Sequence, residues 1–164
     1  MSISGKISID IDFTEVAATG IDHGALSKIH RITDTLSLTD GTTVNKADLL
    51  WSDRRTLDGT ENLDLFGSIT MATGTAFSPV ELVGLYVKNR STAYTLTLGG
   101  HASQAAPIFG DASDTVVIGP GGSFLVTRPD ATGYGVIAAA TLDQIKLVSS
   151  GSLDYDIMIW GRSA

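Results

Sequence analysis

The 164-residue chain contains no cysteine, which excludes disulfide bonds and cysteine-ligated zinc or iron–sulfur sites. Basic residues are also scarce, and 11 of them against 18 acidic residues leave a net charge of −7. Direct binding to nucleic acid is therefore not expected, because phosphate groups require clustered lysine and arginine. No apolar run approaches the ~20 residues of a membrane-spanning helix, and the first residues do not resemble a signal peptide. We expect no membrane partner and synthesis in a cytoplasm.

Side chains suited to catalysis or metal binding are few and dispersed. His23, His30 and His101 are far apart in the sequence, and no His-x-His or His-x-Glu spacing supports a metal site. The Gly-x-Ser-x-Gly turn of many serine hydrolases is absent. We therefore expect a protein that is not an enzyme and needs no cofactor or metal.

One acidic group leaves an alternative open. If the first and last strands lie side by side, a calcium site is conceivable, since each pair of carboxylates shares one face of its strand. A solvated strand face is the favoured interpretation. The residues concerned are Asp10, Asp12, Asp154 and Asp156.

The chain does contain a turn signal about every ten residues. Between Val116 and Trp160, short β-branched runs are separated by Gly, Pro, Ser and Asp clusters at 119–122, 128–130, 131–133 and 149–151. This spacing predicts an antiparallel all-β sandwich or barrel. With no linker or repeat in view, we expect residues 1–164 to form a single domain of nine or ten short strands.

The first strand has the most regular pattern. From 3 to 13, odd positions are mostly isoleucine and even positions are polar, which indicates one buried and one wet face. Residues 1–13 could close the sheet of their own subunit or pair with a neighbouring one. For 15–28 a loop is favoured. Further strands are expected at 32–38, 47–57, 63–66, 69–71 and 80–88, and at 94–98, paired with 80–88 across a turn at 89–91.

An ordered set of strand and turn blocks carries a family resemblance. The blocks lie at 47–57, 61–65, 83–89, 119–124, 129–134 and 155–161. In that order they resemble small β-rich virion proteins of tailed bacteriophages, over about residues 35–164. The resemblance implies a jelly-roll-type sandwich that decorates or cements the head or sits at the head–tail junction. It transfers no catalytic residue, and it implies a virion location, with the host cytoplasm as the site before assembly.

The hypothesis from the sequence is thus a structural protein of a phage particle that stabilises the head through contacts between subunits. It would form a homo-oligomer, with a trimer as the first hypothesis, and would bind the major capsid protein or other virion proteins. Ile7, Ile9, Ile11 and Trp160 are the candidate residues for contacts between subunits. The alternative is a carbohydrate- or receptor-binding module of a tail or head appendage, whose candidate aromatic residues are Trp51, Trp160, Tyr94 and Tyr134.

Overall fold

The computed structural model describes residues 2–17 and 26–164, which form ten β-strands and no helix. The predicted all-β fold with nine or ten antiparallel strands is confirmed. The strands are β1 (Gly5–Ala17), β2 (Leu26–Leu38), β3 (Leu49–Leu57), β4 (Thr60–Asp64), β5 (Glu81–Asn89), β6 (Leu96–Gly99), β7 (Thr115–Ile118), β8 (Ser123–Thr127), β9 (Gln144–Ser149) and β10 (Leu153–Arg162).

Eight of these strands form two antiparallel four-stranded sheets, in the orders β3-β10-β5-β8 and β4-β9-β6-β7. Alternate side chains of each strand point between the sheets, because successive residues of a strand face opposite sides. The buried core includes Leu85 and Val87 of β5, Leu96 and Leu98 of β6, and Tyr155 of β10. The apolar run at 80–88 is thus a central strand, β5, which lies between β10 and β8.

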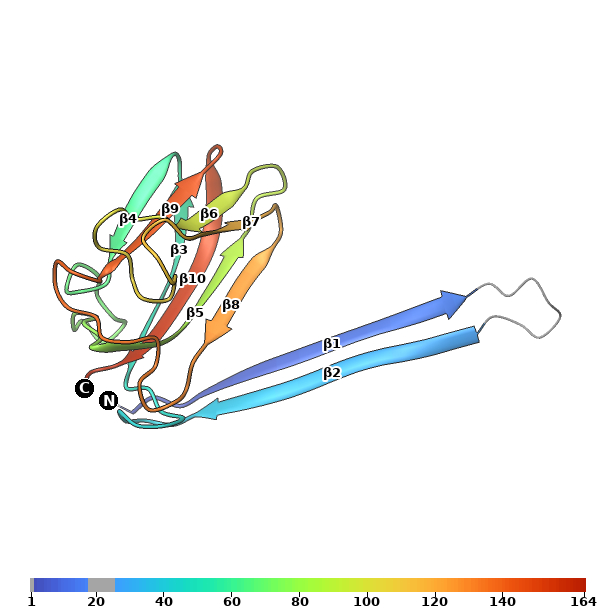
Figure 1. Ribbon diagram of the computed structural model, residues 1–164, viewed down its shortest axis with the longest axis horizontal. Helices are drawn as coiled ribbons and strands as arrows, with labels where there is room; N and C mark the ends of the chain where they lie inside the picture. The colour runs from blue at the N-terminus through green and yellow to red at the C-terminus, as the bar shows by residue number, and fades with distance from the viewer. Residues whose placement is uncertain (1, 18–25) are drawn as a thin grey trace.

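The first two strands form a separate two-stranded sheet that projects from the sandwich as a long hairpin (Figure 1). We call residues 5–17 and 26–38 the arm. Each arm strand has 13 residues, or about 40 Å at roughly 3.4 Å per residue. The loop favoured for 15–28 is wrong at both ends, since β1 continues to Ala17 and β2 begins at Leu26; residues 18–25 lie outside the described residues.

Two local predictions from the sequence are also wrong. Residues 69–71 are not a strand; Thr70 forms a single bridge with Ala76. β6 pairs with β7 and β9 in the opposite sheet rather than with β5. The buried side chain of Asn89 explains the second error, because its Nδ2 donates to the carbonyl oxygens of Tyr94, Ile118 and Gly119, at 2.8, 3.1 and 3.0 Å. These bonds hold a crossing between sheets, where the sequence suggested a hairpin turn.

The arm is attached through Trp160, near the end of β10. Trp160 lies opposite Gly84 of β5, and a Cβ at position 84 would lie 2.2 Å from Cζ2 of the indole ring. Glycine is therefore required for the ring to lie flat on the outer face of its sheet. Leu38 at the base of the arm and Ala47 join Trp160 in a second apolar cluster outside the main core.

The first testable consequence concerns this close approach. Gly84→Ala should displace the Trp160 ring and lower the free energy of unfolding by about 1–3 kcal/mol, the usual cost of overpacking. Gly119→Ala is the matched control, since no atom lies within 4 Å of its added Cβ. Urea denaturation measures both. Equal midpoints for the two variants would contradict the packing described here.

Candidate interaction surface

The two faces of the arm differ in chemistry. The strand register places Ile7 opposite Leu36 and Ile11 opposite Ile32, so these side chains share one face with Ile9. We call it the apolar face of the arm. The other face is mainly polar: Lys6 lies opposite Ser37, Ser8 opposite Thr35, Asp10 opposite Thr33, and Asp12 opposite Arg31.

Coverage of the apolar face ends near the base of the arm. Leu38 is 6% exposed, and Ile7 and Leu36 are partly buried against the cluster around Trp160. Farther out, the exposed fraction rises to 38% for Ile9 and 41% for Ile11, and then to 64% for Ile32 and 68% for Phe13. A two-stranded hairpin without such packing is at best marginally stable in water. The far half of the arm therefore presents an apolar surface that its own chain leaves uncovered.

The far part of the arm also carries apolar side chains on its second face. Val16 and Ile29 are 62% and 63% exposed, and the register places both on the face opposite Phe13 and Ile32. A hairpin that lay on one surface would keep its second face polar. Apolar side chains on both faces suit an arm that is contacted from two sides.

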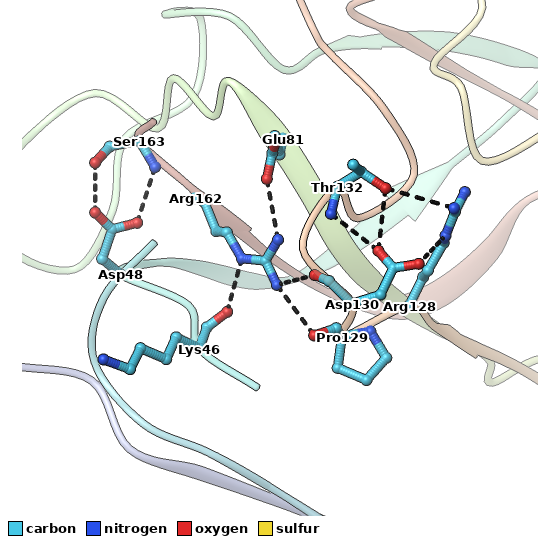
Figure 2. Close-up of polar contacts among 9 residues, drawn as sticks. All are labelled: Lys46, Asp48, Glu81, Arg128, Pro129, Asp130, Thr132, Arg162 and Ser163. Atoms are coloured by element: carbon cyan, nitrogen blue, oxygen red, sulfur yellow. Dashed lines mark hydrogen bonds and ion pairs between the residues drawn. The ribbon is translucent and has the colours of Figure 1, made fainter. Parts of the chain in front are cut away.

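A buried arginine secures the loop through which the arm rejoins the sandwich (Figure 2). The guanidinium of Arg162 is fully buried; it pairs with Glu81 at 3.0 Å and donates to the carbonyl oxygens of Lys46, Pro129 and Asp130, at 3.1, 3.2 and 2.6 Å. These contacts connect the end of β10 to the loop after β2, to β5 and to the loop after β8. They fix the chain on both sides of the attachment point.

The outer face of the β3-β10-β5-β8 sheet holds a second, partly uncovered apolar surface, in which Tyr86 packs against the cluster around Trp160. The register aligns four side chains across the sheet, and we call them the open row: Ser52, Met158, Tyr86 and Leu125. Met158 and Leu125 are 41% and 37% exposed. Ser52, Met158 and Tyr86 line an open hollow of about 550 Å³, to which Arg54 and Asp156 also contribute.

Charged side chains border the open row on one side. Asp156 accepts hydrogen bonds from Arg90 and Arg54, at 2.5 and 2.6 Å between nitrogen and oxygen. The hydrogen bond from Arg90, followed by that from Arg54, lowers the pKa of Asp156 to about 2. The carboxylate therefore stays ionised at neutral pH, and the three groups together carry one net positive charge.

The sequence candidates for subunit contacts fall into two groups. Ile9 and Ile11 lie on the exposed part of the arm, whereas Ile7 and Trp160 are in the contact between the arm and its own sandwich. A role for any of them between subunits stays a prediction. Phe13 and Ile32 were not among the candidates, although the alternation predicted at 32–38 would have found Ile32 once that strand was paired with the first.

The other candidate chemistries are not brought together. β1 pairs with β2, and β10 lies between β3 and β5, so the four aspartates considered for calcium do not gather. Within residues 2–17 and 26–164, no group of three or more metal-ligating side chains is found. His30 lies 3.1 Å from Glu15 on the arm, His101 accepts from the Gln104 amide, and His23 lies outside the described residues.

The aromatic residues proposed for sugar binding are dispersed as well. Trp51 and Trp160 are 6% and 5% exposed, Tyr134 packs against the core, and Tyr94 is the exposed member of this set. They form no exposed aromatic platform. Among the residues that the structure describes, none belongs to a helix long and apolar enough to cross a membrane.

A second prediction tests the buried arginine. Arg162→Met should lower the free energy of unfolding by about 3–5 kcal/mol, because it leaves Glu81 without its partner in a buried site. Arg128→Met is the control, since its ion pair with Asp130 is half exposed on both sides and should contribute little. Urea denaturation of both variants is the measurement. A midpoint for Arg162→Met as high as that of the control would show that the buried network does not secure this end of the sandwich.

Comparisons with protein-family models, curated proteins and solved structures find no match for this chain. Its function is therefore inferred from its own surfaces. Two of these are apolar and uncovered: the far half of the arm and the open row on the outer face of the sandwich. Both are suited to contacts with other proteins.

Proposed function

We propose that this chain is a non-enzymatic structural protein of a tailed-phage virion, a head decoration or cement protein. It would stabilise the head through contacts among its own subunits and with the major capsid protein. The observation that carries the proposal is the projecting arm, whose apolar face is covered at its base and exposed beyond Ile9. An exposed apolar surface of this kind marks a site of protein interaction.

The connectivity of the sandwich supports the jelly-roll part of the proposal. Counted from β3, one sheet contains the first, eighth, third and sixth strands, and the other contains the second, seventh, fourth and fifth. Jelly rolls consist of eight strands in two sheets and recur in viral capsid proteins. This order is the one expected for such a fold. It supports an architecture suited to a particle.

The chemistry of the chain fits a role in assembly. The sandwich has a continuous apolar core and no cysteine, so it needs no disulfide to fold. The net charge of −7 favours solubility of the free subunit. On a particle, many copies would act together, and multivalency would turn contacts of modest strength into a stable layer.

The third prediction tests the arm in full-length protein. The variant replaces Ile11, Phe13 and Ile32 by threonine. Threonine is β-branched and suits a strand, but it removes the apolar surface. The binding partner is a phage particle from which this protein has been removed. Half-saturation of such particles should require at least about tenfold more of the variant than of the unmodified chain, since burial of one apolar side chain contributes about 1.5–3 kcal/mol. Co-sedimentation measures binding.

The control for this experiment replaces two equally exposed valines of the sandwich, Val117 and Val136, by threonine. It should bind like the unmodified chain. The urea midpoints of all three proteins establish that each is folded. The proposal is overturned if the unmodified chain neither sediments with particles nor associates with itself.

A further inference from the structure

We propose that the apolar face of the arm docks on the open row of a second copy of this chain. The inference rests on the proposed function, in that it names the partner of the arm within the assembly. Each subunit would contribute an arm to one neighbour and receive an arm on its own sandwich. The surfaces involved are Ile9, Ile11, Phe13 and Ile32 of the arm, and Met158, Tyr86 and Leu125 of the open row.

The proposed docking continues a contact that the chain already makes. At its base, the apolar face of the arm packs through Ile7 and Leu36 on Trp160, which belongs to the outer face of the sheet. The open row is the next row of side chains on that same face, since Met158 precedes Trp160 by two residues on β10. Two successive rows of the sheet thus have the same apolar character, and one is already matched to this face of the arm.

A single chain leaves much of both surfaces exposed. From its base the arm runs away from the sandwich (Figure 1). Ile11 and Met158 are each 41% exposed, which would not be so if the arm lay over its own open row. A second copy of the chain offers a complement to both surfaces at once.

Shape and charge agree with this assignment. Met158 and Tyr86 of the open row line a shallow, open hollow of about 550 Å³. Asp34 lies opposite Ile9 on the apolar face of the arm. The receiving side carries Arg54 and Arg90 around Asp156, and the neighbouring Asp53 pairs with Arg55. An acidic group on the arm would meet a surface with a net positive charge, which favours the correct orientation during docking.

Mutual exchange also brings the contact closer to the size of a stable interface. Such interfaces bury about 800 Å² on each partner. A chain that both gives an arm and receives one uses two apolar patches, whereas a chain that only gives an arm uses one. Closed exchange of this kind is compatible with a cyclic oligomer of two, three or more subunits.

The absence of cysteine permits a direct test in the full chain. One variant carries Ile11→Cys with one affinity tag, and a second carries Met158→Cys with another tag. After mixing and mild oxidation, the disulfide between the two variants should form about tenfold or more in excess of the control, because docking raises the effective concentration of the two thiols. The control partner is Val117→Cys, at an exposed site on the opposite sheet.

A second measurement needs no disulfide. Met158→Asp should lower the mass of the associated species in light scattering, while Val117→Asp should not. Equal coupling of Ile11→Cys to both cysteine partners, or unchanged association of Met158→Asp, overturns the docking site. That failure differs from failure of the proposed function: the arm could still be required for particle binding. Conversely, selective coupling in a chain that never binds particles would support the docking and contradict the virion role.

Discussion

The packing of the arm on Trp160 is the contact on which the rest of this account depends. The indole ring can lie flat on its sheet because residue 84 is glycine, and it then offers the base of the arm an apolar surface. Its Nε1 has no hydrogen-bond partner among the described residues, so packing holds the ring in place. Arg162 secures the adjoining loop through one ion pair and three carbonyl oxygens. Together these contacts fix the direction of the arm.

Fixing the base exposes the remainder of the arm. A hairpin that could fold back would bury its isoleucines on its own sandwich, as the hydrophobic effect favours. Held at its base, this arm leaves Phe13 and Ile32 more than 60% exposed, while the open row around Met158 stays uncovered on the same molecule. In the docking that we propose, the two surfaces are the complementary halves of a contact between chains. A rigid sandwich with a directed arm is a physically reasonable unit for an assembly that relies on many weak contacts.

The sequence predicted the class of fold well because alternation and turn residues are local signals. It identified the apolar positions of β1 and the strand at 80–88, but it missed the pairing of β1 with β2 and the crossing after β5. Both errors concern contacts between residues far apart in the sequence. The first is the pairing of β1 with β2 outside the core, and the second is the crossing that Asn89 holds by donating to three carbonyl oxygens. Trp160 was selected as a candidate for contacts between subunits, since a strand pattern cannot reveal that a hairpin 120 or more residues earlier in the chain packs on it.

The central claim is that a partner covers the far half of the arm in the assembled state. Hydrogen–deuterium exchange of the arm amides, in the free chain and in the assembled layer, tests it most directly. The account predicts that amides around residues 9–13 and 29–32 exchange markedly more slowly after assembly, while those of the core strand β5 change little. Equal exchange of the arm in the two states would contradict it.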